Sequence, residues 1–146
     1  MTYIGVLFFT SNVMADNLHK FTINDIDGNL INLNQFKGKP VLLVNTASRC
    51  GFTKQYANLS NLHQEYFEKS LVIIGTPSNS FRQELEEEKD VKEFCLINYD
   101  TKFIISEIID VKGDTAHPLY KWMTKAYGKT PKWNFFKYLF DGEGNL

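Results

Sequence analysis

Cys50 is the residue whose setting in the sequence most clearly suggests chemistry. It follows an apolar run, residues 41–44, that predicts a buried strand, and an amphipathic stretch begins nearby at Gln55. A strand that leads into a helix through a short loop leaves backbone N–H groups without intrahelical partners beside the cysteine. These donors and the positive end of the helix dipole favour the thiolate over the thiol. The pattern predicts that Cys50 is a reactive thiol.

Gln83, Trp133 and Asn134 carry N–H donors that could act together with this thiol. Gln83 follows a second predicted strand, residues 71–75, so we expect it at the same edge of the sheet as Cys50. Trp133 and Asn134 precede the last predicted strand. Indole and carboxamide N–H groups directed at a sulfur would stabilise a thiolate, and also an alkoxide or hydroxide leaving group. For Trp133, a place among the core aromatic residues is the alternative.

Cysteine and histidine usage argues against metal and disulfide frameworks. Cys50 and Cys95 are the two cysteines, which are too few for a disulfide scaffold and lack the Cys-x-x-Cys spacing of dithiol and zinc sites. The three histidines are scattered, without a His-x-x-x-His pair: His19, His63 and His117. We therefore expect no metal site, and no motif for another cofactor is visible.

Length and composition describe an ordinary globular domain. The chain has 146 residues, 43% of them hydrophobic and 23% charged, which suits one domain with a full core. Sixteen basic and seventeen acidic residues give a formal charge of −1 without a dense basic patch, which argues against nucleic acid as the main partner. The twelve phenylalanines and seven tyrosines are spread along the chain and favour an aromatic core over a platform for stacking bases.

The first half of the chain predicts a hairpin, a strand and a helix. Alternating apolar and polar residues flank Asp27-Gly28, a pair typical of a hairpin turn. The buried strand, residues 41–45, follows a turn that contains glycine and proline. In residues 55–69, apolar side chains recur at spacings of three and four, which predicts a helix with one buried stripe.

The middle of the chain continues with a helix and further strands. The acidic run of residues 84–90 predicts the solvated start of a helix, where negative charge suits the dipole. This helix continues with Phe94 and Cys95 on one face. Two short apolar runs, residues 103–105 and 108–111, predict at least one strand.

The last third predicts one more helix and one more strand. Pro118 suits the first turn of a helix that Asp114 or Thr115 would cap. Residues 135–140 predict a strand that leads into a glycine-rich turn. Strands with apolar, β-branched runs that alternate with helices indicate an α/β core with helices on both faces of the sheet.

The two ends of the chain raise separate expectations. Residues 4–9 are apolar and residues 13–15 are similar to the small-x-small pattern of a signal cleavage site, so residues 1–16 are a leader or a possible signal segment. A signal would place the protein in the periplasm or another extracytoplasmic compartment, and otherwise it would be cytoplasmic. Residues 17–146 form the predicted domain. Because the chain ends just after the turn of residues 141–145, we expect its C-terminal strand and helix to be missing.

Three separate motifs resemble those of the glutathione peroxidase family. Asn45-Thr-Ala-Ser-Arg-Cys-Gly-Phe-Thr is similar to the family's Asn-Val-Ala-Ser-x-Cys-Gly-Phe-Thr signature, and His117-Pro-Leu-Tyr and Trp133-Asn-Phe match further family motifs. The resemblance covers residues 21–146, roughly in the family's order, and fits its cysteine-containing bacterial type. It implies a thioredoxin-like fold, a central mixed sheet flanked by helices, with an N-terminal β-hairpin. It also implies reduction of hydrogen peroxide and of organic or lipid hydroperoxides to water or alcohols, in the response to oxidative stress.

The resemblance implies roles for individual residues. Cys50 matches the peroxidatic position, which becomes a sulfenic acid, and Gln83, Trp133 and Asn134 match the supporting donors. The motif around Gln83 departs from the family pattern. It lacks one residue before the glutamine, and Leu85-Glu86 replaces the usual Pro-Gly. The register of Gln83 is therefore the point at which this chain differs most from the family.

The resemblance also implies how the sulfenic acid is reset. Either glutathione attacks twice, or a second cysteine forms a disulfide that thioredoxin reduces, so glutathione or thioredoxin is the co-substrate. Cys95 lies in the predicted helix in which relatives carry such a resolving cysteine, and a small buried core residue is the alternative. A bridge to Cys50 would require this helix to unwind, because two sulfurs must reach bonding geometry.

The sequence also bears on oligomeric state, membrane association and alternative functions. The short segment between Trp122 and Trp133 resembles the monomeric branch of the family, whose open site accepts bulky lipid hydroperoxides. No segment is long enough to span a bilayer. A redox sensor or binding module with little or no catalytic activity is the alternative function on the same fold. The missing Cys-x-x-Cys disfavours a dithiol reductase, and the missing cofactor motif disfavours a haem or flavin peroxidase.

Overall fold

The N-terminal part of the fold is an antiparallel hairpin. The structure is a computed structural model that describes residues 15–146, so most of the predicted leader lies outside the described residues. β1 (Thr22–Asn24) pairs with β2 (Leu30–Asn32). Gly28 in the connecting turn has a φ of 84°, a conformation that glycine adopts without strain. The hairpin predicted at Asp27-Gly28 is confirmed.

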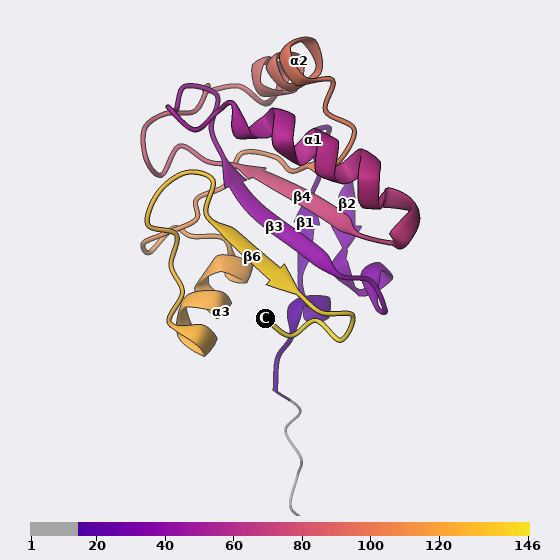
Figure 1. Ribbon diagram of the computed structural model, residues 1–146. Helices are drawn as coiled ribbons and strands as arrows, with labels where there is room; N and C mark the ends of the chain where they lie inside the picture. The colour runs from indigo at the N-terminus through magenta and orange to yellow at the C-terminus, as the bar shows by residue number, and fades with distance from the viewer. Residues whose placement is uncertain (1–14) are drawn as a thin grey trace, which may run out of the picture.

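The central sheet is mixed and has the strand order β5-β4-β3-β6. Figure 1 shows β4, β3 and β6 side by side. β3 (Val41–Thr46) is parallel to β4 (Val72–Pro77), and β4 is parallel to β5 (Ile104–Ile105). β6 (Lys137–Phe140) is antiparallel to β3, so the predicted mixed sheet is confirmed. The apolar run at 103–105 contains β5, whereas residues 108–111 form no strand.

Helices cover both faces of this sheet. Figure 1 shows α1 and α2 on one face and α3 on the other. Their bounds are α1 (Gln55–Tyr66), α2 (Glu88–Tyr99) and α3 (Pro118–Tyr127). Short 3-10 helices lie at η1 (Leu18–Lys20), η2 (Leu33–Phe36) and η3 (Phe67–Lys69), and η3 accounts for the last turn of the helix predicted for residues 55–69. In the described part of the chain, no helix is both long and apolar enough to cross a membrane.

The starts of α2 and β6 differ from the prediction. α2 begins at Glu88, later than predicted, and Glu84 is only 4% exposed in the loop before the helix. The prediction of a solvated run from residue 84 is therefore wrong at its first residue. β6 begins at Lys137 instead of Phe135, because Phe135 has a φ of 63° that cannot continue a strand.

The start of α3 also has a different cap from the one predicted. His117 occupies the N-cap position, and its Nδ1 accepts the N–H of Leu119 at 3.2 Å. Pro118 stands in the first turn, as predicted. The proposed caps, Asp114 and Thr115, lie before the helix, so that prediction is wrong.

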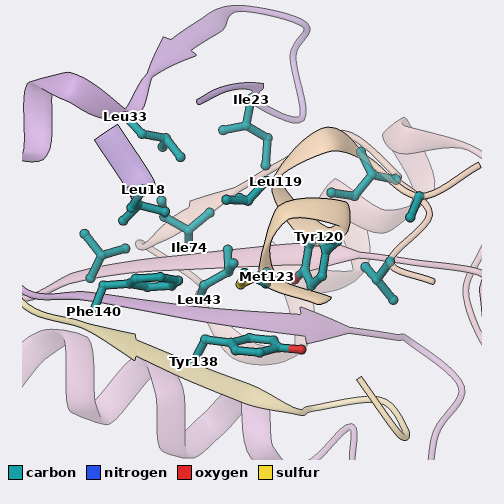
Figure 2. Packing of buried hydrophobic residues seen from close by; sticks show 14 residues of the cluster. Leu18, Ile23, Leu33, Leu43, Ile74, Leu119, Tyr120, Met123, Tyr138 and Phe140 are labelled. Atoms are coloured by element: carbon teal, nitrogen blue, oxygen red, sulfur yellow. The ribbon is translucent and has the colours of Figure 1, made fainter. Parts of the chain in front are cut away.

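Apolar side chains alternate between the faces of the sheet and form two clusters. One lies between the sheet, α3 and the hairpin, where Figure 2 shows Leu43 and Ile74 of the sheet near Leu119 and Met123 of α3. The other lies beneath α1 and α2 and is formed by Val44, Tyr56, Leu59, Ile73, Val91, Cys95, Phe103, Ile105 and Phe135. The two clusters hold the helices against the two faces of the sheet. The loops that connect strands and helices are therefore anchored on both faces.

Candidate active site

The loops that carry the predicted site residues meet at one end of the sheet. Cys50 lies between β3 and α1, Gln83 lies between β4 and α2, and Trp133 and Asn134 precede β6. β3 and β4 are parallel, and β6 runs in the opposite direction beside β3. The ends of β3 and β4 and the start of β6 therefore lie at the same edge (Figure 1).

The sulfur of Cys50 is partly exposed and accepts a hydrogen bond from its own loop. The N–H of Phe52 donates to Cys50 Sγ at 3.3 Å. The N–H of Cys50 donates to Thr53 Oγ1 at 2.9 Å, and the Thr53 hydroxyl donates to the Ala47 carbonyl at 2.8 Å. The predicted backbone donor is thus present, but it comes from the loop because α1 begins only at Gln55.

Gln83 and Asn134 are in direct contact beside the Cys50 loop. Asn134 Nδ2 donates to Gln83 Oε1 at 2.8 Å, and Asn134 is only 3% exposed. The N–H of Arg49, the residue before Cys50, donates to the Gln83 carbonyl at 2.9 Å. Asn134 uses the acceptor oxygen of the Gln83 amide, so the amide nitrogen of Gln83 remains available as a hydrogen-bond donor. The structure brings these two predicted amides to the thiol loop despite the shortened motif around Gln83.

Trp133 lies at the surface of the same region. Its side chain is 43% exposed, and its ring centroid lies 5.1 Å from that of Phe81. The alternative of a buried core aromatic is therefore wrong. Within residues 15–146, no hydrogen bond joins the indole of Trp133 or the sulfur of Cys50 to the Gln83–Asn134 pair. The two groups share the edge of the sheet without a direct polar link.

Asn45 holds the segment that carries Trp133 and Asn134. It is fully buried at the end of β3, its Nδ2 donates to the Trp133 carbonyl at 3.0 Å, and its Oδ1 accepts the Phe136 N–H at 3.0 Å. The N–H of Phe135 also donates to the backbone carbonyl of Asn45, at 2.6 Å. The sequence did not lead us to predict this residue for the site. The signal was a lone carboxamide at the end of an apolar strand, since a buried carboxamide requires partners.

Glu84 is a second residue that the sequence did not assign to this region. Its Oε1 accepts the N–H of Ser48 at 3.0 Å and that of Leu85 at 2.8 Å. Burial raises the pKa of the Glu84 carboxyl group above its ordinary value, and hydrogen bonds from Ser48 and Leu85 act in the opposite direction. A carboxyl group is therefore buried at the base of the Cys50 loop.

Cys95 lies in α2 and is 2% exposed. It is part of the apolar cluster beneath α1 and α2, and Cys50 packs against that cluster from outside. Burial raises the pKa of the Cys95 thiol to about 11, and both cysteines are free. In the folded helix Cys95 is therefore a neutral, enclosed thiol.

Within residues 15–146, no group of three or more histidine, cysteine or acidic side chains is arranged to hold a metal ion.

The strand order, the helices on both faces and the cysteine after β3 define a thioredoxin-like fold with a candidate thiol site. The chain resembles a thiol:disulfide interchange protein of the thioredoxin family from Chlorobium tepidum, with a TM-score of 0.67. The match covers 86% of this chain and 78% of that one at 15% identity, so it shows the fold alone.

Sequence comparisons specify the family. The family model for glutathione peroxidase matches residues 18–124. A glutathione peroxidase of Lactococcus lactis subsp. cremoris is 39% identical over 135 residues, which are 89% of this chain and 86% of that protein. A hydroperoxy fatty acid reductase of Synechocystis is 36% identical over 140 residues, which are 88% of this chain and 83% of that protein. This chain belongs to the glutathione peroxidase family, as its three motifs implied.

Proposed function

We propose that Cys50 is the peroxidatic thiol of this chain and that Gln83, Trp133 and Asn134 donate hydrogen bonds to the reacting groups. As a family member, the chain is a thiol-dependent peroxidase that reduces hydroperoxides. The observation that carries the assignment of residues is the Gln83–Asn134 hydrogen bond beside the Cys50 loop. It unites segments that are far apart in the sequence, and each of them carries a group suited to this reaction.

The first half-reaction breaks the O–O bond of the hydroperoxide. The Cys50 thiolate attacks one peroxide oxygen, an S–O bond forms, and the O–O electron pair leaves with the other oxygen. The leaving alkoxide or hydroxide takes up a proton and becomes an alcohol or water, and Cys50 is oxidised to a sulfenic acid. The Phe52 N–H is hydrogen-bonded to the sulfur that attacks. Donors on Gln83 and Trp133 would stabilise the charge that develops on the leaving oxygen.

The second half-reaction requires two thiol equivalents. A first thiol condenses with the sulfenic acid to give a disulfide and water, and a second thiol reduces that disulfide. We assign the first step to Cys95, which gives a Cys50–Cys95 disulfide. The second step falls to thioredoxin, whose two thiols reduce that disulfide by two exchanges and become a disulfide themselves. Glutathione is the alternative for both steps, since Cys50 is partly exposed and can be reached from solvent.

A resolving role for Cys95 requires local unwinding of α2. Two observations support this motion: the helix buries only Val91 and Cys95, and its N-cap residue, Glu87, makes no side-chain capping bond. Leu96 and Ile97 on its outer face are 51% and 73% exposed. A helix held by so few buried side chains belongs to the less stable part of a fold.

The surroundings of Cys50 favour organic hydroperoxides over hydrogen peroxide alone. Phe52, whose N–H is bonded to the Cys50 sulfur, has a side chain that is 52% exposed, so apolar surface borders the partly exposed thiol. Such a border can bury part of an alkyl chain. We propose that the chain accepts lipid-type hydroperoxides, the class in the name of its Synechocystis relative. We also propose that it acts as a monomer.

The test compares peroxide consumption by the parent, Cys50→Ser and Cys95→Ser proteins with glutathione and with thioredoxin. Each reductant is combined with hydrogen peroxide and with a fatty acid hydroperoxide. We expect Cys50→Ser to be inactive throughout and Cys95→Ser to lose turnover with thioredoxin. Parent-like peroxide consumption by Cys50→Ser would show that another group carries the reaction.

The same assay separates catalysis from the alternative of a redox sensor. A catalyst consumes many equivalents of peroxide per protein, whereas a sensor stops after one equivalent. Undiminished turnover of Cys95→Ser with thioredoxin would contradict the resolving role and leave Cys95 as a core residue. A second-order rate constant that is lower for the fatty acid hydroperoxide than for hydrogen peroxide would contradict the proposed substrate class.

A further inference from the structure

Glu84 is a buried carboxyl group that the proposed reaction does not use. Its side chain is 4% exposed and follows Gln83 directly in the chain. One oxygen, Oε1, accepts two backbone N–H groups, from Ser48 at 3.0 Å and from Leu85 at 2.8 Å. The other oxygen, Oε2, is buried and has no hydrogen-bond partner in the described part of the chain. Burying such a group is unfavourable, so its position calls for an explanation.

The contacts of Glu84 join the two loops that meet at the thiol. Ser48 stands two positions before Cys50, and its N–H reaches the Glu84 side chain. The next residue, Arg49, donates its N–H to the carbonyl of Gln83. Two successive residues of the Cys50 loop are therefore hydrogen-bonded to two successive residues of the loop that carries Gln83.

The backbone geometry explains why a carboxyl group occupies this position. Neither loop belongs to the sheet at this point, so no strand partner is available for the N–H groups of Ser48 and Leu85. A side chain with an acceptor oxygen must supply both bonds. The Glu84 N–H donates in turn to Asn79 Oδ1 at 3.3 Å, which fixes the backbone from which the carboxyl group extends.

We propose that Glu84 is a positioning residue that holds the Cys50 loop against the Gln83 loop through Oε1. Its role rests on the proposed function, since it acts through the relative placement of the Cys50 sulfur and the Gln83 amide. Attack on a peroxide requires both groups to reach the two oxygens at once. A displacement of about 1 Å between such groups lowers a rate by as much as about a hundredfold.

The test uses two reactions of Cys50 that differ in what they require. Oxidation by hydrogen peroxide, followed by stopped-flow fluorescence in a single turnover, needs the sulfur and its neighbouring donors. Alkylation by iodoacetamide needs only an accessible thiolate. We expect Glu84→Ala to slow the oxidation about tenfold to a hundredfold while alkylation changes less than about threefold. Glu84→Gln keeps an acceptor oxygen and should oxidise within about threefold of the parent.

Controls distinguish positioning from a general loss of structure. Glu86→Ala removes an exposed carboxylate from the same segment and should leave both rates unchanged. If Glu84→Ala does not fold, Glu84→Asp replaces it, because the shorter side chain cannot span to Ser48 and should show the same selective loss. Parent-like oxidation in the alanine or aspartate variant would overturn the proposal, as would equal slowing of oxidation and alkylation or a glutamine variant as slow as alanine. If the parent itself shows no Cys50 oxidation, the proposed function fails instead.

Discussion

Replacing Asn45 with alanine should lower the free energy of unfolding by about 2–6 kcal/mol, because it leaves two partly buried backbone groups without partners. Asn45 donates to the carbonyl of Trp133 and accepts the N–H of Phe136, both at 3.0 Å, and it has no exposed surface. A buried donor or acceptor without a partner costs about 1–3 kcal/mol. Two such groups give the stated range, and the smaller value applies if water reaches the segment.

Equilibrium unfolding in guanidinium chloride, followed by far-UV circular dichroism under reducing conditions, measures this effect. The matched control is Asn98→Ala. The Asn98 side chain also donates to a backbone carbonyl, that of Phe94 at 2.9 Å, but it lies on the exposed face of α2. Its removal should change the free energy by less than about 0.5 kcal/mol, as is usual for surface substitutions.

The reasoning about Asn45 also predicts a functional effect. Because the segment that it holds carries Trp133 and Asn134, peroxide turnover should fall in the Asn45→Ala protein under conditions in which it is fully folded. A free-energy loss no larger than that of Asn98→Ala would refute the argument, since it would mean that the two bonds do not hold the segment.

Two further predictions concern the core and the turns. Burial raises the pKa of Cys95 from an ordinary 9.0 to about 11, so its contribution to stability is fully present below pH 9.0 and is lost as the pH rises through about 11. From neutral pH to about 10.5, the parent should lose about 2 kcal/mol more unfolding free energy than Cys95→Ala, and equal losses would show that the thiol is not enclosed. At Gly142, an added Cβ would lie 3.0 Å from the carbonyl carbon of Gly38. Gly142→Ala should therefore cost about 1–3 kcal/mol in the guanidinium titration. Gly51→Ala, which meets no atom within 4 Å, serves as its control, and a similar cost for both would contradict the close approach.

Local patterns were sufficient for much of the fold. Local residue patterns correctly predicted the hairpin at Asp27-Gly28, the apolar strands β3 and β4, and the helix between them. The start of α2 was not predictable in this way. An acidic run indicates a solvated helix start only if each carboxylate meets water, and Glu84 instead meets the backbone of Ser48 and Leu85.

The sequence predicted which segments meet at this edge of the sheet but not the bonds that join them. Cys50, Gln83 and Asn134 were proposed together from their residue types, their places near strand ends and the family resemblance. The bonds that join their segments come from Asn45 and Glu84, which reach across the structure to backbone groups. Every non-proline residue has the same backbone N–H and carbonyl groups. The spacing of residue types therefore does not indicate which side chain will hydrogen-bond to them.

The strand order has a consequence for the way in which the site assembles. The register pairs Val41 with Val72 on one side and with Phe140 on the other, so β3, α1 and β4 form a local unit and β6 joins it only after a long loop closes. We expect the thiol and Gln83 to take their places early in folding and Trp133 and Asn134 to arrive last. As an edge strand that pairs with β3 alone, β6 can also fray while β3 and β4 stay paired. Under the proposed assignment, a molecule opened there would keep Cys50 in place and lose Trp133 and Asn134 as donors, so we expect its thiol to react with electrophiles in general.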